Sequence, residues 1–113
     1  MPIQIHELTD DYFDAWSRMR RSLWGDKEDD CTAAFDDYLR QRPNQAMNLI
    51  AVSETGSPVG FIESALRTDY VEGTDASPVW YVEGIFTEEH PRKQGVARAL
   101  VHDTTLRGAS EHL

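Results

Sequence analysis

Cysteine is almost absent from the sequence, since Cys31 is the only one among 113 residues. A single cysteine excludes an internal disulfide and any metal site built from several thiolates. The four histidines are scattered, and none has the spacing of a zinc motif such as HExxH. We therefore expect no bound metal and interpret Cys31 as a packed thiol.

Long apolar runs are missing as well. The longest are only a few residues, far short of the roughly 20 that a membrane-spanning helix needs. The first residues, MPIQIHEL, have neither the basic region nor the apolar region of a secretory signal. These absences favour a cytoplasmic protein. The length predicts one domain over residues 1–113, with one modest core.

Positive charge is scarce. Eleven Lys and Arg stand against twenty Asp and Glu, which gives a formal net charge of −9. Because nucleic-acid binding depends on Lys and Arg contacts with phosphates, this balance argues against a nucleic-acid partner. An acidic cleft would attract a polycationic substrate. Alternatively, the acidic residues only keep the surface soluble, and composition alone favours that interpretation.

What is present is a pattern of short periodic segments that predicts a mixed α+β domain with the order β-α-α-β-β-β-α. The predicted elements are a strand at 3–8, a helix from about 10 to Gly25, a helix from about 31 to Pro43, strands at 47–52, 59–68 and 79–87, and a helix at 96–109.

Local signals define the ends of these elements. Thr9 and Asp10 are suited to cap the first helix. The turn SETGSP should join two strands into an antiparallel hairpin. The polar loop at 69–78 is too long for a tight turn, and such loops often carry function. We expect one face of the second helix to be buried, with Cys31, Ala34, Phe35, Tyr38 and Leu39 on it.

The stretch PRKQGVARAL, at residues 91–100, combines two cations and a glycine at a predicted helix start. The first amides of a helix lack internal partners, and its dipole favours negative charge, so this arrangement predicts an anion site. Gly95 would let backbone approach the anion closely, and Arg92 and Lys93 would add charge. Alternatively, Gly95 only eases a turn and both cations are solvated.

The same stretch carries a family resemblance. Residues 92–97, RKQGVA, match the [Q/R]xxGx[G/A] motif of the GNAT superfamily of acetyl-CoA-dependent N-acetyltransferases. With the stretches RSLW, DYVEG, TDASP and YVEGIF, the sequence resembles the aminoglycoside 6′-N-acetyltransferases over nearly its whole length. The resemblance implies a mostly antiparallel sheet flanked by helices, with acetyl-CoA as the acetyl donor.

The resemblance also implies the cofactor contacts. Backbone groups of Ile85, Phe86 and Thr87 would face pantetheine beside a bulge, for which Gly84 is a suitable residue. The pyrophosphate would lie on the amides of Arg92, Lys93, Gln94, Gly95, Val96 and Ala97.

Acetyl transfer needs a neutral amine, so a nearby carboxylate that accepts the amine's proton is useful. Glu83 interrupts an apolar strand, and apolar surroundings would desolvate it and raise its pKa towards that of a useful base. Related 6′-acetyltransferases have a matching glutamate, so the resemblance makes Glu83 the catalytic candidate. The alternative is a glutamate on a solvent-facing strand surface.

By the same similarity, the aminoglycoside cleft would be lined by Trp24, Tyr70, Glu72 and Asp75. Carboxylates pair with ammonium groups, and rings supply apolar faces for sugars. Trp24 could instead be core packing and Asp75 could simply shape its loop. The resemblance also implies a homodimer.

The chain departs from the family at Leu113, where relatives continue with further strands and a helix. We therefore expect an incomplete N-acetyltransferase domain that lacks the C-terminal strands and helix. Three hypotheses stay open: aminoglycoside 6′-N-acetyltransferase, an acetyltransferase for polyamines or other small amines, and a non-catalytic CoA-binding or dimerisation module.

Overall fold

The computed structural model describes residues 3–25, 27–68, 78–88 and 93–112. The order of elements confirms the predicted β-α-α-β-β-β-α arrangement, with a short 3-10 helix, η1, added before the first helix. The elements are β1 (Gln4–Glu7), η1 (Asp10–Tyr12), α1 (Phe13–Trp24), α2 (Glu28–Gln41), β2 (Ala46–Val52), β3 (Pro58–Thr68), β4 (Pro78–Thr87) and α3 (Lys93–His112).

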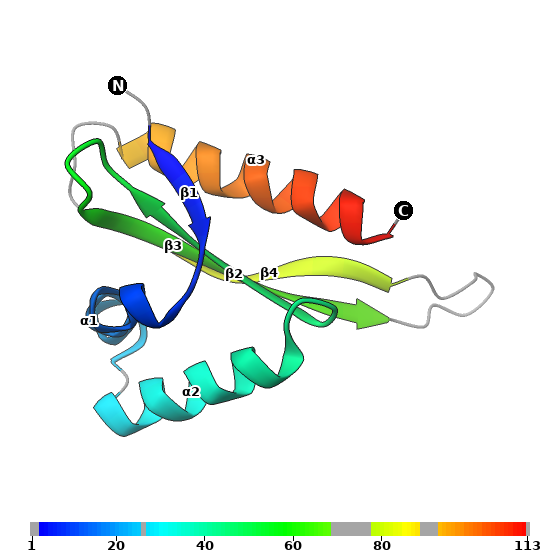
Figure 1. Ribbon diagram of the computed structural model, residues 1–113, viewed down its shortest axis with the longest axis horizontal. Helices are drawn as coiled ribbons and strands as arrows, with labels where there is room; N and C mark the ends of the chain where they lie inside the picture. Colours follow the sequence, from blue (N-terminus) through cyan, green and yellow to red (C-terminus); the bar gives the residue numbers. More distant parts are fainter. Residues whose placement is uncertain (1–2, 26, 69–77, 89–92, 113) are drawn as a thin grey trace.

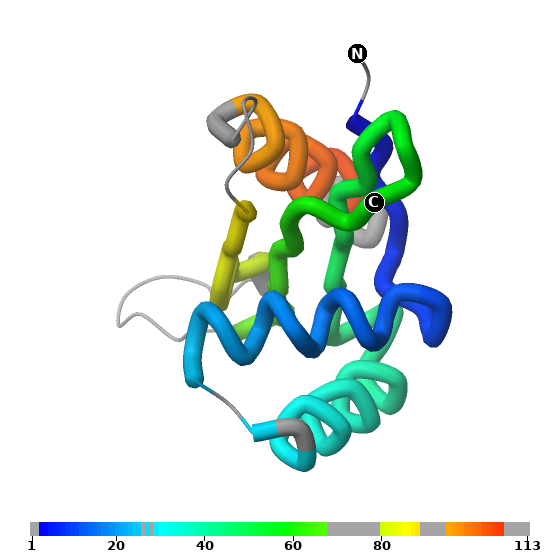
Figure 2. Tube along the Cα trace, turned by 90° about the vertical axis from the view of Figure 1, so that its left-hand side faces the viewer, coloured from blue at the N-terminus to red at the C-terminus, as the bar shows by residue number. Residues whose placement is uncertain are grey.

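The strands form one four-stranded sheet in the order β1-β2-β3-β4, and every neighbouring pair is antiparallel. α3 crosses one face of this sheet, while α1 and α2 cover the other (Figure 1). The side view separates the three layers (Figure 2). Because β2 is covered on both faces, all seven of its residues are buried, which explains its nearly continuous apolar sequence.

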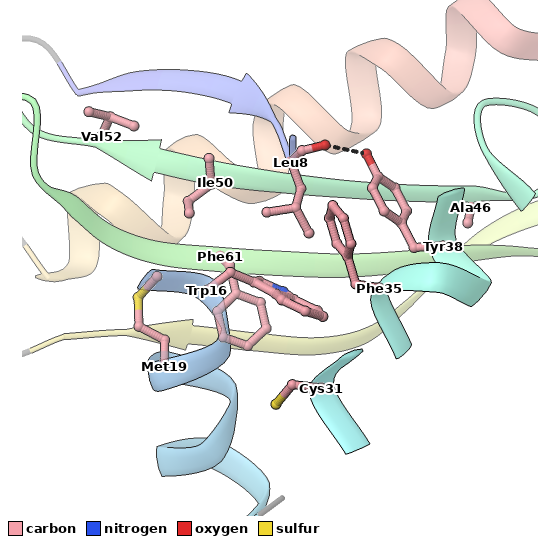
Figure 3. Packing of buried hydrophobic residues seen from close by; sticks show 10 residues of the cluster. All are labelled: Leu8, Trp16, Met19, Cys31, Phe35, Tyr38, Ala46, Ile50, Val52 and Phe61. Atoms are coloured by element: carbon pink, nitrogen blue, oxygen red, sulfur yellow. Dashed lines mark hydrogen bonds between the residues drawn. The ribbon is translucent and has the colours of Figure 1, made fainter. Parts of the chain in front are cut away.

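Each face of the sheet has its own hydrophobic cluster. Under α1 and α2, the rings of Trp16, Phe35 and Phe61 pack with centroids 5.8 Å (Trp16–Phe35) and 6.5 Å (Trp16–Phe61) apart (Figure 3). Under α3, Val96 and Leu100 lie fully buried among residues of β2 and β3. The helices are therefore fixed to the sheet by apolar burial from both sides.

A β-bulge interrupts the pairing of β3 with β4. Glu63 pairs with Gly84 and Ser64 pairs with Val82, so Glu83 is one extra residue on β4. The expected bulge at Gly84 is confirmed, with the inserted residue directly before it. A bulge leaves its extra residue out of the ladder and re-aims the neighbouring side chains.

The structure corrects three details of the sequence interpretation. Thr9 precedes η1 without a side-chain capping bond. α3 begins at Lys93, three residues earlier than predicted, so Gly95 lies inside its first turn. Leu39 is 44% exposed, and the buried face of α2 is centred on Cys31, Phe35 and Tyr38.

The ends of α1 and α2 follow their sequence signals. α1 stops at Gly25, whose φ of 69° places it in the left-handed region that favours glycine. α2 ends at Gln41, two residues before Pro43, because proline cannot continue a helix. In the part of the chain that the structure describes, no helix is long and apolar enough to cross a membrane.

Candidate functional site

A pocket opens beside the bulge, on the face covered by α1 and α2. Its lining consists of Arg20 and Trp24 from α1, Glu63 from β3 and Glu83 from β4. A second hollow shares Arg20, Glu63 and Glu83 and continues beneath α2 as far as Asp37. The two hollows form one groove, which we call the bulge groove. The charged residues that the two hollows share are one cation, Arg20, and two carboxylates, Glu63 and Glu83.

Glu83 lies in the groove but is not desolvated. Its side chain is 42% exposed, and its Oε2 accepts a hydrogen bond from Nη2 of Arg67 at 2.7 Å. The structure therefore favours the alternative of a solvent-facing glutamate over the partial desolvation that the apolar neighbours predicted. The physical reason is that the bulge takes Glu83 out of the ladder of β4, the outermost strand of the described sheet.

The buried carboxylate of the groove is Glu63, which sequence reasoning missed. Nη1 of Arg20 lies 2.8 Å from both carboxylate oxygens of Glu63, and the two side chains are only 17% and 12% exposed. Burial raises the pKa of Glu63, and the nearby Arg20 guanidinium opposes that rise. The available signal was the single charge in the apolar strand VGFIESAL.

Trp24 forms a wall of the groove. It is 42% exposed, and its ring makes an edge-on contact with Phe61 at 6.4 Å between centroids. The guanidinium of Arg20 lies over the ring, 4.4 Å from its centroid. On the side of the sheet, the ring covers Gly84, where a β-carbon would lie 2.4 Å from Cζ2 of Trp24. Trp24 thus both packs against the protein and presents apolar surface to the groove.

The residues expected to face pantetheine continue β4 after the bulge. Ile85, Phe86 and Thr87 pair with Ile62, Phe61 and Gly60 of β3. In the described sheet β4 pairs with β3 only, so its other edge is available to a further extended backbone. The side chains of Ile85 and Phe86 pack against the two hydrophobic clusters, one on each face of the sheet.

The predicted anion site coincides with the first turn of α3. Gly95 is exposed, and a β-carbon on it would meet nothing within 4 Å. Its φ is not positive, so neither packing nor backbone strain within the described residues requires a glycine there. Val96 is fully buried and anchors the turn to the sheet, while Ala97 is half-buried. The open space and the first-turn amides together suit an external anion.

Several of the predicted site residues lie outside the described residues. They are Tyr70, Glu72, Asp75 and Arg92, together with the side chains of Lys93 and Gln94. Among the residues that are described, no group of three or more His, Cys, Asp or Glu could hold a metal ion.

A family model defines the class of protein to which this fold and groove belong. The model described as the acetyltransferase (GNAT) family matches residues 5–105, which include the bulge and the first turn of α3. The chain therefore belongs to the GNAT family of acetyltransferases.

Within that family the chain is homologous to aminoglycoside 6′-N-acetyltransferases. It is 34% identical over 99 residues to the "Aminoglycoside N(6')-acetyltransferase type 1" of Salmonella typhimurium, covering 88% of this chain and 67% of that protein. The protein of the same name from Serratia marcescens is 39% identical over 92 residues, covering 80% and 62%. The chain thus spans roughly two thirds of these relatives.

Solved structures agree with this assignment and confirm the GNAT-like fold. AAC(6')-Ih from Acinetobacter baumannii superposes with a TM-score of 0.83 at 27% identity, covering 96% of this chain and 73% of that one. AAC(6')-Iy, solved with the bisubstrate analogue CoA-S-monomethyl-acetylneamine, gives a TM-score of 0.84 at 29% identity, covering 99% and 75%.

Proposed function

We propose that this chain carries the donor-binding and acceptor-binding elements of an acetyl-CoA-dependent N-acetyltransferase that acts on the 6′-amine of aminoglycosides. The observation that carries the proposal is the bulge in β4, which places a carboxylate, Glu83, in a groove beside the edge of β4 that pairs with no other strand of the described sheet. The relatives of known name support the aminoglycoside as acceptor.

On this proposal, acetyl-CoA supplies the thioester as the acetyl donor. The edge of β4 at Ile85, Phe86 and Thr87 pairs with the pantetheine arm, and a backbone amide polarises the thioester carbonyl. The first turn of α3 holds the pyrophosphate, and Gly95 leaves it room. Arg92, which lies outside the described residues, completes this predicted cradle with Lys93, Gln94, Val96 and Ala97.

The chemistry is direct transfer in a ternary complex. Glu83 accepts a proton from the acceptor ammonium, directly or through a water. The neutral amine then attacks the thioester carbon, so that a C–N bond forms and the C–S bond breaks. Coenzyme A leaves as the thiolate and takes up the proton that the new amide nitrogen loses, so that the products are the acetamide and free thiol and no acyl-enzyme forms.

On the acceptor side, the wall of Trp24 supplies an apolar face for a sugar ring. Tyr70, Glu72 and Asp75, which lie outside the described residues, stay predicted acceptor contacts. A homodimer also stays part of the proposal.

The direct test measures thiol release from acetyl-CoA with tobramycin, kanamycin or spermidine as acceptor. We expect turnover with the aminoglycosides and its loss in Glu83→Gln. Turnover with spermidine alone would replace the aminoglycoside with a polyamine.

Calorimetry with coenzyme A tests the donor site separately. Binding of coenzyme A without turnover of any amine, together with a dimer in light scattering, would favour a non-catalytic module. If coenzyme A does not bind, the transferase proposal fails at its first step.

A further inference from the structure

We propose that Arg20 is a positioning residue, which together with Glu63 holds the indole of Trp24 against the bulge of β4 and so fixes the wall of the acceptor groove. This inference rests on the proposed function, because it assigns the role of a residue in that same groove. Arg20 itself is not expected to touch the reacting atoms.

The inference starts from a closed circle of contacts. Arg20 donates from Nη1 to both carboxylate oxygens of Glu63, at 2.8 Å each. Glu63 pairs across the sheet with Gly84. Gly84 lies under the ring of Trp24, and that ring lies under the guanidinium of Arg20, 4.4 Å from its carbon Cζ. Each member is therefore in contact with two others, and the Glu63–Gly84 pair of the circle borders the bulge.

The chemistry of arginine suits this place. A guanidinium is planar, so it can pair with a carboxylate through its edge while its face stacks on aromatic rings. Here it stacks on Trp24, and it also lies 5.3 Å from the ring centroid of Trp16. Trp16 is fully buried in the cluster under α1 and α2, so it anchors the guanidinium to the core.

Stability alone does not account for the pair. Removing two charges from water costs free energy that their attraction only partly returns, so well-packed apolar residues are often as good or better. An apolar pair, however, has no planar cation to stack on Trp24. Trp24 is 42% exposed and its ring is edge-on to Phe61. An apolar pair would therefore deprive it of the guanidinium that lies over its ring. The pair therefore contributes a fixed geometry to the groove.

That geometry matters because Trp24 has to contact a sugar ring of the acceptor while Glu83 contacts the acceptor's amine. Orientation of bound reactants contributes strongly to rate, and small misplacements are costly. A Trp24 ring that leaves Gly84 would narrow or open the groove next to Glu83. Binding of the donor depends on a different part of the chain, the edge of β4 and the first turn of α3, and should stay intact.

The test removes both charges at once, so that neither is left buried and unpaired. We compare wild type with the double variant Arg20→Met/Glu63→Met and with Arg20→Lys, which keeps the charge but loses the planar stack. Arg21→Met is the matched control, because Arg21 is the next residue of the same helix and its Nε donates to a backbone oxygen of that helix, on Ser17. The readouts are steady-state kinetics, calorimetry with coenzyme A and the NMR signal of the Trp24 indole N–H, assigned with Trp24→Phe.

We expect the double variant to stay folded and to bind coenzyme A as wild type does. Its KM for tobramycin should rise about tenfold, which corresponds to the loss of one contact of cation–π strength. The Trp24 signal should move in the double variant and in Arg20→Lys, and should not move in Arg21→Met. An unmoved Trp24 signal, or an unchanged KM, in the double variant would overturn the inference.

The two proposals fail in different ways. If wild type acetylates no amine, the proposed function fails, while the NMR comparison still decides whether Arg20 holds Trp24. If wild type is active but the double variant leaves both the Trp24 signal and the KM for tobramycin unchanged, only the positioning role fails.

Discussion

The indole of Trp24 lies where a side chain on Gly84 would have to be. A β-carbon at position 84 would come 2.4 Å from Cζ2 of Trp24 and 2.7 Å from its Cη2, closer than atoms of a folded protein pack. Gly84 therefore lets the C-terminal end of α1 approach the bulge. This contact connects α1, which lines the proposed acceptor groove, to β4, the strand that is proposed to bind the donor.

Gly84→Ala should displace Trp24 or push β4 away from α1. We expect a loss of about 1–3 kcal/mol in the free energy of unfolding, the usual cost of forcing an extra carbon into a packed site. Thermal unfolding measures it. In a Trp24→Ala background the same substitution should cost much less, and an equal cost in both backgrounds would show that the clash is not with Trp24.

Gly95→Ala should have opposite effects on stability and on donor binding. Alanine is the better helix former by up to about 1 kcal/mol, and the space around Gly95 is open, so the free protein should become slightly more stable. If the pyrophosphate occupies that space, calorimetry should show a roughly tenfold weaker affinity for coenzyme A, which corresponds to about 1.4 kcal/mol. Unchanged affinity would place the anion elsewhere.

Glu83→Gln should remove activity without loss of stability. The ion pair with Arg67 is exposed on both sides, and such pairs contribute under about 1 kcal/mol, so the melting temperature should hardly change. Loss of the proposed base should lower kcat by about 10²–10⁴-fold.

Arg67→Gln is the control for Glu83→Gln, since it breaks the same ion pair and keeps the carboxylate. It should retain most of the activity. If both variants lost activity equally, the ion pair rather than the carboxylate would be the functional unit.

Tyr38→Phe should destabilise the fold near neutral pH. The buried hydroxyl of Tyr38 donates to the backbone oxygen of Leu8 at 3.0 Å, which ties α2 to the end of β1 (Figure 3). The variant leaves that oxygen without its bond, so we expect a loss of about 1–3 kcal/mol in chemical denaturation.

The same hydroxyl gives the protein a pH dependence. Burial raises the pKa of Tyr38 above its ordinary value of 10.0, with the charge of Arg42 opposing the rise. The folded state then keeps the proton at pH values where the unfolded chain loses it, so this contribution is full below pH 10 and declines as the pH rises through the folded-state pKa. Stability should fall less steeply above pH 10 in Tyr38→Phe than in wild type, and equal slopes would contradict the assignment.

The layers of the fold could be predicted from the sequence because apolar periodicity reports burial directly. The nearly continuous apolar sequence of β2, which Asn48 interrupts, is typical of a buried strand, and all its residues are buried. The start of α3 was predicted at Val96, directly after Gly95, whereas the helix begins at Lys93. A glycine in the first turn costs a helix little when tertiary contacts of Val96 and Leu100 hold it to the sheet.

The candidate site was harder to predict. Glu83 and Trp24 were selected by family resemblance, and both lie in the groove. Burial was assigned to the wrong carboxylate, because strand alternation does not reveal which strand forms the edge or where a bulge lies. The partner of Glu63 is 43 residues away on α1, and such a long-range ion pair leaves no local pattern in the sequence.

The residue inserted in β4, Glu83, also bears on which changes in length that strand can accept. Trp80, before the inserted residue, and Ile85, after it, both pack against the hydrophobic cluster under α3. They are five positions apart, whereas residues on the same face of a regular strand are separated by an even number. Deleting Glu83 would leave Trp80 and Ile85 four residues apart, so a regular strand would still direct both toward α3 and would keep Phe86 beside Phe61. The two hydrophobic clusters therefore do not require the inserted residue, and its loss would be felt in the groove rather than in the packing.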